Sequence, residues 1–284
     1  MIVQDDAVVY QQLRQLATRQ RLVFFAGLPG TGKSLLSHQL THLAVAAGRI
    51  VHLLQWDMAR PVFEAHPYGQ RYPVVDGVTH GVIRIAVSRW ARLALLQWER
   101  EHSDPAHLLI GETPFIGHRF MDLAWRLPDA AEEVLQHASV FVLPVPSAPV
   151  RHYIEMERQR RSIHPVHPQE REDAPPQVLQ ALWQELARLA PHFGLAQPVG
   201  DLPVPYDPAL YQAIYTCLLK HRQVCVLPMH TRLPTAQVSV YDFAVKYLPL
   251  LPGPADVLRC IQAVEQAYPD AMVLQHALTQ WYLV

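Results

Sequence analysis

The chain has 284 residues, of which 50% are hydrophobic and 17% are charged, and its formal net charge at pH 7 is −1. This length is enough for one large α/β domain, or for a core domain with a sizeable insertion or tail. The composition supports a buried core and argues against extensive disorder. The near-zero charge excludes a broad electrostatic footprint for nucleic acid or an anionic membrane. No signal peptide or membrane-length apolar run is visible, so we expect a cytoplasmic protein. We expect this protein to bind neither nucleic acid nor a membrane.

The first half of the chain alternates helical and strand patterns. Three segments have the 3.6-residue apolar period of helices, namely 5–19, 33–47 and 79–101. Three short apolar runs are typical of buried strands, namely 22–26, 50–54 and 108–110. Between the second strand and the third helix, residues 58–77 contain Pro61, Pro67 and Pro73, and we expect them to be irregular.

The second half contains most of the 25 prolines and is expected to be rich in turns. Strands are predicted at 140–143, where Pro144 and Pro146 would end the strand, and at 224–227. Helices are predicted at 129–137, 150–161, 177–190, 255–267 and 270–282. The 16 histidines are scattered, and we interpret most of them as surface or core residues.

Strands that alternate with helices at this spacing predict right-handed βαβ units and a mainly parallel sheet of about five strands. We expect a core over residues 1–230, with a helical lid at about 150–176, and a C-terminal extension over 231–284 packed on that core. The sequence does not indicate an oligomeric state.

Residues 27–34, GLPGTGKS, match the phosphate-binding pattern G-x-x-x-x-G-K-[ST] and lie between a predicted strand and a predicted helix. Glycines let successive backbone N–H groups face phosphate oxygens, and the helix start adds a positive dipole end. The motif predicts a P-loop NTPase with a three-layer αβα sandwich that binds ATP and Mg²⁺. The alternative is a glycine-rich turn that merely joins strand to helix. The expected nucleotide-binding residues are Gly27, Pro29, Gly30, Thr31, Gly32, Lys33 and Ser34, with Lys33 on the β- and γ-phosphates and Ser34 on Mg²⁺.

Several classes of P-loop protein are disfavoured by missing motifs. A GTPase would carry DxxG and NKxD motifs, and an ABC ATPase would carry LSGGQ, but the sequence has none of these. A motor or helicase core would have a strand that ends in two acidic residues, and no predicted strand does. What is present resembles the small-molecule and nucleotide kinase branch of the P-loop proteins.

The segment at 54–60, LQWDMAR, resembles the end of the second strand in the adenylylsulfate kinase, chloramphenicol phosphotransferase and zeta-toxin families. In those families an Asp is followed three residues later by an Arg. The resemblance implies that Asp57 faces the acceptor hydroxyl and that Arg60 holds the substrate or a phosphate. Gln55 replaces the first Asp of the common Asp-x-Asp form.

Residues 140–146, VFVLPVP, followed by RHYIEMERQRR, resemble the fourth strand and lid helix of the same kinases. The resemblance implies that lid arginines close over the triphosphate. The available lid arginines are Arg151, Arg158, Arg160 and Arg161. Arg158 shares a helix face with both Arg151 and Arg161, and we favour Arg158 and Arg161 for this catalytic role. A solvated basic helix, paired with Glu155 and Glu157, is the alternative.

Two acidic residues follow predicted strands at the edge where parallel sheets bind ligands, namely Asp57 and Glu112. We expect Asp57 to act as the base and Glu112 to support Mg²⁺ or bind the acceptor, although either acid could instead cap a helix or turn. Arg119, which follows the third strand, is a candidate for acceptor binding. Together these residues predict transfer of the γ-phosphate of ATP to a small molecule. An ATP-binding regulatory protein or slow ATPase is the main alternative, and an interaction module is the third.

Overall fold

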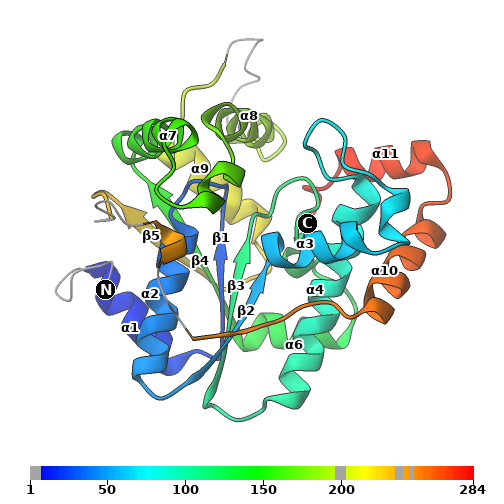
Figure 1. Ribbon diagram of the computed structural model, residues 1–284, viewed down its shortest axis with the longest axis horizontal. Coiled ribbons are helices and arrows are strands. Elements are labelled where there is room, and N and C mark those ends of the chain that lie inside the picture. The colour runs from blue at the N-terminus through cyan, green and yellow to red at the C-terminus, as the bar shows by residue number, and fades with distance from the viewer. Residues whose placement is uncertain (1–7, 196–202, 234–238, 243–245) are drawn as a thin grey trace.

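The computed structural model describes residues 8–195, 203–233, 239–242 and 246–284 (Figure 1). It is an α/β structure with a single six-stranded sheet in the order β5-β4-β1-β3-β2-β6. All five strand pairs are parallel, so the carboxyl ends of the strands lie at one edge. The strands are β1 (Leu22–Ala26), β2 (Ile50–Gln55), β3 (His107–Thr113), β4 (Ser139–Pro146), β5 (Val224–Met229) and β6 (Leu248–Pro249).

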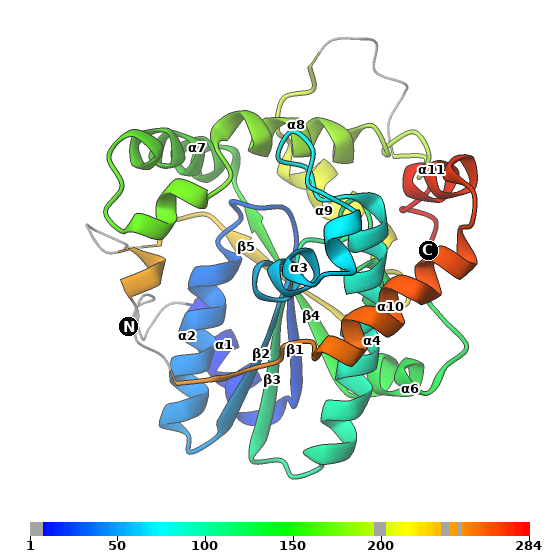
Figure 2. The same cartoon turned by 45° about the vertical axis from the view of Figure 1, so that its right-hand side comes forward.

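Helices cover both faces of this sheet, an arrangement compatible with a three-layer sandwich (Figure 2). The α-helices are α1 (Val8–Arg19), α2 (Lys33–Ala46), α3 (Trp56–Ala65), α4 (Gly81–Glu101), α5 (Met121–Ala124), α6 (Ala130–His137), α7 (Ala148–Ile163), α8 (Pro176–Ala187), α9 (Pro208–Leu218), α10 (Pro254–Ala267) and α11 (Ala271–Thr279). Three 3-10 turns join them, η1 (Gly69–Arg71), η2 (Pro168–Glu172) and η3 (Val240–Asp242). Among the described residues, none of these helices has both the length and the apolar character needed to cross a membrane.

The central strand β1 is buried on both faces, which explains its unbroken apolar sequence. Val23 and Phe25 pack into the core under α1 and α2, whereas Leu22 and Phe24 pack into the larger core on the other face. Burying each such side chain contributes roughly 1.5–3 kcal/mol, so β1 anchors both layers. The loop that follows β1 therefore starts from a rigid base.

The expectation that residues 58–77 are irregular is wrong for their first part, because α3 extends from Trp56 to Ala65 with Pro61 inside it. Pro61 cannot donate the helical hydrogen bond to Asp57. Trp56, Ala59 and Phe63 are nevertheless spaced three and four residues apart, and all three are buried. Packing of this apolar face outweighs the lost hydrogen bond.

The expected end of the fourth strand at residue 143 is also wrong, because β4 continues to Pro146. The backbone N–H groups of Phe141 and Ser147 donate hydrogen bonds toward β5. Because N–H groups alternate between the two sides of a strand, the N–H positions of the even-numbered residues between them point toward β1. The last β1 partner in this ladder is paired with Val142. The missing N–H groups of Pro144 and Pro146 therefore fall where no strand needs them.

Three elements, α9, α5 and β6, lie where no helix or strand was predicted. Asp207 caps α9 by accepting the N–H of Ala209 at 2.8 Å, and Pro208 occupies its first turn. This Asp-Pro start is a recognisable helix signal. The remaining predicted helices and strands are confirmed with small shifts of their ends; residues 5–7 of the first predicted helix lie outside the described part of the chain.

The chain after residue 230 is joined to the main sheet and to α4. Its short strand β6 pairs with β2 through Leu248 and Pro249, so the sheet has six strands rather than the expected five. Helices α10 and α11 both contact α4. The hydroxyl of Tyr72 donates to Glu265 of α10, which fixes this helix beside the segment that follows α3.

Candidate functional site

The loop between β1 and α2 contains three glycines in a backbone conformation that other residues rarely adopt. The φ angles of Gly27, Gly30 and Gly32 are 133°, 73° and 87°. The N–H of Gly27 donates to the carbonyl of Thr113 at 3.2 Å, which ties the loop to the end of β3. Since α2 begins directly after Gly32, its positive dipole end opens onto this loop. A glycine-rich loop followed by a helix start is an arrangement that can bind an anion.

Lys33 is the first residue of α2, directly after this loop, and is only 6% exposed. Its Nζ donates to the carbonyl of Leu28 at 2.8 Å, and the hydroxyl of Thr31 donates to the same oxygen at 2.9 Å. Burial lowers the pKa of Lys33 to about 8, although the carboxylates of Glu112 and Asp57 favour its charged form. A bound anion would stabilise this ammonium group more strongly than a neutral carbonyl does.

Ser34 and Glu112 meet at the carboxyl edge of the sheet. The hydroxyl of Ser34 donates to Oε1 of Glu112 at 2.7 Å, and Nε2 of Gln55 donates to Oε2 at 3.0 Å. Strand register explains the contact, because Glu112 is opposite Phe25 of β1 and Gln55 of β2. Glu112 was expected after the third strand but lies inside β3. A hydroxyl and a carboxylate in contact form a pair of hard oxygen donors.

Asp57 lies in the first turn of α3, and its side chain reaches solvent at the same edge of the sheet. The surrounding protein raises its pKa by partial desolvation and Glu112 adds to this, whereas Arg60, Lys33 and Arg119 lower it. Asp57 therefore lies in the electrostatic field of three cations and one carboxylate.

Arg60 and Arg119, the two predicted acceptor-binding arginines, come to Asp57 from different elements. Arg60 is one turn along α3 and pairs with Glu64 at 2.9 Å. Nη1 of Arg119 donates to the carbonyl of Ile116 at 3.3 Å, and burial lowers the pKa of Arg119. Two guanidinium groups near one carboxylate suit an anionic or hydroxyl-bearing ligand.

The loop from Pro114 to Phe120, between β3 and α5, is strained. Phe115, His118 and Phe120 have φ angles of 44°, 68° and 62°, in the left-handed region that non-glycine residues avoid. Each costs on the order of 1–3 kcal/mol and persists only where other contacts hold it. The Tyr215 hydroxyl donates to the carbonyl of Pro114 at 2.9 Å, which supplies part of that restraint. Such strain is concentrated at functional loops.

The α7 arginine that contacts the glycine-rich loop is Arg151, which we had not selected. Its Nη1 donates to the carbonyl of Pro29 at 3.0 Å and its Nη2 to the carbonyl of Leu179 at 3.2 Å. Its Nε pairs with Glu155 at 2.8 Å. Arg151 lies in the first turn after β4, and this position beside the strand end was the available signal. It holds α7, α8 and the loop together.

The two selected arginines of α7 have different surroundings. Arg158 pairs with Asp173 and is close enough to Lys33 to lower the pKa of that lysine. Arg161 pairs with Glu170 at 2.5 Å and lies 3.6 Å from Glu157. The structure thus brings Arg158 toward the loop and engages Arg161 with η2.

Tyr211 of α9 is a site residue that the sequence analysis missed, because the helix that carries it was not predicted. Its hydroxyl accepts the N–H of Leu28 at 3.3 Å. A β-carbon added at Gly27 would lie 2.2 Å from this hydroxyl. Tyr211 therefore requires glycine at the first position of the motif.

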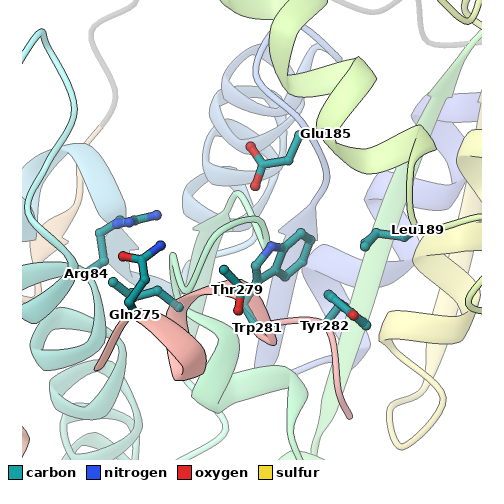
Figure 3. Close-up of a pocket in the computed structure, with 8 residues that line it drawn as sticks. Arg84, Glu185, Leu189, Gln275, Thr279, Trp281 and Tyr282 are labelled. Atoms are coloured by element: carbon teal, nitrogen blue, oxygen red, sulfur yellow. The ribbon is translucent and has the colours of Figure 1, made fainter. Parts of the chain in front are cut away.

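A cavity of about 350 Å³ adjoins the strained loop, between α4, α8 and the end of the chain (Figure 3). Nη1 of Arg84 donates to the carbonyl of Gly117 at 2.9 Å, which connects the cavity wall to that loop. Burial lowers the pKa of Arg84 to about 10, and Arg119 adds to this effect. The lining residues are Arg84, Glu185, Leu189, Gln275, Leu278, Thr279, Trp281 and Tyr282.

The predicted residues Lys33, Ser34, Asp57 and Glu112 thus lie together at the carboxyl edge of the sheet. Helices α7 and α8 lie above this edge of the sheet in both views (Figures 1 and 2). Comparison of the chain with protein-family models, curated proteins and solved structures finds no match.

Proposed function

We propose that this protein is an ATP-dependent phosphotransferase of the P-loop NTPase class that moves the γ-phosphate of ATP to a small molecule. The observation that carries the proposal is the contact between Ser34 and Glu112 beside the buried ammonium group of Lys33. It combines a motif for phosphate with a pair of oxygen donors for a divalent cation, at the edge where parallel sheets bind ligands.

Nucleotide binding is supported by the strand order. β1 lies between β3 and β4, and the chain crosses from one side of β1 to the other between these strands. Ligands of open α/β sheets bind at the carboxyl side of such a switch point. The triphosphate would lie on residues Gly27, Pro29, Gly30, Thr31 and Gly32, with Lys33 releasing Leu28 to contact the β- and γ-phosphates.

The donor atoms present fit Mg²⁺. This ion prefers oxygen ligands and retains several water molecules, so one hydroxyl and one carboxylate suffice beside the phosphates. Ser34 and Glu112 would hold it, and when bound it would neutralise charge on the phosphate oxygens.

In the proposed transfer, the acceptor hydroxyl attacks the γ-phosphorus and a new O–P bond forms. The bond from that phosphorus to the β–γ bridging oxygen breaks, and ADP leaves with the electron pair. The carboxylate of Asp57 orients the hydroxyl and takes its proton. Arg60 and Arg119 hold the acceptor, while Arg158, and Arg161 once released from Glu170, stabilise charge on the transferring group.

A second function, an ATP-dependent switch or slow ATPase, is favoured by one contact. The hydroxyl of Tyr241, from the segment after residue 230, donates to Asp173 at 2.8 Å, and Asp173 also pairs with Arg158. A nucleotide that drew Arg158 inward would break the ion pair between Arg158 and Asp173, and with it the connection from Arg158 to Tyr241. Binding of ATP alone would then alter the contacts of the segment around Tyr241, with no acceptor needed.

Measurement of ADP release with and without a panel of small-molecule acceptors distinguishes the two functions. Release that depends on an acceptor and is lost in Lys33→Ala supports the phosphotransferase. Saturable binding of ATP with no acceptor-dependent release would instead identify the switch. Absence of ATP binding in wild-type protein would refute both.

A further inference from the structure

Three histidines from different elements meet at the amino edge of the sheet. They are His52 of β2, His107 at the start of β3, and His102, which caps the carboxyl end of α4. Nε2 of His52 lies 3.0 Å from Nδ1 of His107, and one ring nitrogen from each of the three lies within 4.8 Å of the others. The rings of His102 and His107 stack with centroids 4.5 Å apart. Among the described residues this is the cluster with metal-ligand geometry.

We propose that His52, His102 and His107 form a binding site for a divalent transition-metal ion, best fitted to Zn²⁺, with water as its fourth ligand. Three imidazoles suit Zn²⁺ and are poor ligands for Mg²⁺ or Ca²⁺. His52 is buried while the other two are half-buried, so solvent reaches one side of the cluster. That open side supplies both an entry path and the water.

The spacing needs only a small adjustment. Tetrahedral Zn²⁺ with Zn–N bonds of about 2.0–2.1 Å separates its ligand nitrogens by about 3.3 Å. His52 and His107 are already 3.0 Å apart. The third nitrogen has to move by about 1.5 Å or less, and His102 lies at a helix end, where such a movement is easiest.

The backbone of two ligands is held by arginines. Nη2 of Arg49 donates to the carbonyl of His107 at 2.8 Å, and Nη2 of Arg21 donates to the carbonyl of His102. Arg21 also pairs with Glu99 at 2.7 Å, which offsets one of the two positive charges. The guanidinium group of Arg49 remains, and its positive charge disfavours metal ions that bind mainly through electrostatic attraction. The site therefore selects an ion that bonds covalently to nitrogen, which again favours Zn²⁺ over Mg²⁺.

The competing explanation is a cluster of neutral rings that only stack and share hydrogen bonds. Burial and the two neighbouring rings lower the pKa of His52 to about 4, so its ring is neutral at pH 7 in either case. The two explanations differ in whether all three nitrogens act together on one ion. Metal affinity, rather than fold stability alone, separates them.

The ion would have a structural role at a distance from the proposed ATP site. The connection from α4 to β3 lies at the lower edge of Figure 1, opposite the glycine-rich loop. Helix α4 starts near the strained loop, where Arg84 contacts Gly117, and ends at Glu101, directly before His102. A metal ion would fix the far end of this helix to β2 and β3.

The test uses full-length, chelator-treated protein titrated with Zn²⁺ in excess Mg²⁺, which occupies oxygen-donor sites. We expect one ion per chain by calorimetry. His102→Gln and His107→Gln should each weaken Zn²⁺ binding by roughly 100-fold or more, since even changes outside the ligand set cost 10–100-fold. His42→Gln, at an exposed histidine on α2, is the matched control and should bind as wild type does.

Folding is checked by thermal unfolding in chelator, where His102→Gln and His107→Gln should match wild type because both side chains are half-buried. Added Zn²⁺ should raise the Tm of wild type and His42→Gln but not of the two ligand variants. Absence of Zn²⁺ binding in wild type, or equal affinity in wild type and the ligand variants, overturns the site.

Discussion

The hydroxyl of Ser34 donates a 2.7 Å hydrogen bond to Oε1 of Glu112, which joins the last residue of the glycine-rich motif to the penultimate residue of β3. The two residues are 78 positions apart in the chain. Their contact depends on parallel pairing of β1 with β3, which sets Phe25 opposite Glu112. The proposed Mg²⁺ site is therefore a product of sheet register as well as of the motif.

Substitution of Glu112 should raise the Mg²⁺ requirement of phosphate transfer. Glu112→Gln keeps the shape of the side chain but removes its charge, so we expect the rate to fall on the order of 100-fold and to need more Mg²⁺ for saturation. The rate as a function of Mg²⁺ concentration at saturating ATP measures both effects. Glu133→Gln, at an exposed position of α6, is the control. An unchanged Mg²⁺ dependence would show that Glu112 is not a ligand.

Nucleotide affinity should decrease as the pH rises above about 8. The pKa of Lys33 in the free protein is lowered to about 8, so the ammonium is charged below this pH and loses its proton above it. A bound triphosphate favours the charged form, so the affinity should weaken by up to about tenfold per pH unit between the free and bound pKa values. Binding of a non-hydrolysable ATP analogue from pH 7 to 10 measures this. In Lys33→Met the weak remaining affinity should not change over that range. A flat profile for wild-type protein would contradict the role of Lys33.

The lowered pKa of Lys33 also predicts the direction in which the free energy of unfolding changes with pH. Because Lys33 in the folded protein has a pKa below its unfolded value of 10.5, the unfolded chain binds more protons between about pH 8 and 10.5. The contribution of Lys33 to the free energy of unfolding should therefore increase with pH in that window. Chemical denaturation of wild type and Lys33→Met at pH 7.5 and 10 isolates it as the difference between the two proteins. A difference that does not change with pH would show that Lys33 is not desolvated.

Asp57→Asn should separate transfer from nucleotide binding. The variant keeps the size of the side chain but cannot accept the acceptor proton, so we expect the transfer rate to fall on the order of 100-fold or more. ATP affinity should change little, because Asp57 is proposed to face the acceptor. Asp76→Asn, at a turn with φ 50° that Asn tolerates, is the matched control. Transfer at the wild-type rate in Asp57→Asn would remove it as the base.

Alanine substitutions at Gly27 and Gly48 should distinguish the effect of steric crowding from that of backbone strain. Both have positive φ angles, but a β-carbon at Gly48 meets nothing within 4 Å, whereas one at Gly27 lies 2.2 Å from the Tyr211 hydroxyl. Gly48→Ala should cost about 1 kcal/mol of unfolding free energy, from backbone conformation alone. Gly27→Ala should cost roughly 3 kcal/mol or more, because overpacking is added.

A double variant tests the cause. The ring carbon that carries the hydroxyl is 3.5 Å from the added β-carbon, an ordinary contact. Adding Tyr211→Phe to Gly27→Ala should thus recover part of the loss in chemical denaturation. Equal losses in Gly27→Ala and Gly48→Ala, with no recovery in the double variant, would exclude the clash.

Local signals were sufficient to predict the centre of the fold. The apolar run of β1, the glycines at 27–32 and the apolar period of α2 are adjacent in the sequence, and β1 and α2 are confirmed as elements. Their order predicted a parallel sheet, and the carboxyl edge then followed from geometry. For this reason Lys33, Ser34 and Glu112 could be predicted to lie at the same edge.

Long-range packing determined the features that the sequence did not reveal. The prolines of β4 are tolerated because β1 has already ended beside them. Arg151 rather than Arg158 contacts Pro29, because the first turn of α7 lies nearest the strand end. Tyr211 reaches Leu28 from 183 residues away, and the histidine cluster joins residues up to 55 positions apart. No local pattern encodes these distances.

The central claim is tested most directly by following the γ-phosphate of labelled ATP in the presence of Mg²⁺ and a mixture of small-molecule acceptors. We predict that label moves into a small molecule other than inorganic phosphate, and that this transfer is lost in Lys33→Ala and strongly reduced in Asp57→Asn. Label that remains in ATP, or appears only as inorganic phosphate, while the wild-type protein binds the nucleotide would contradict the phosphotransferase.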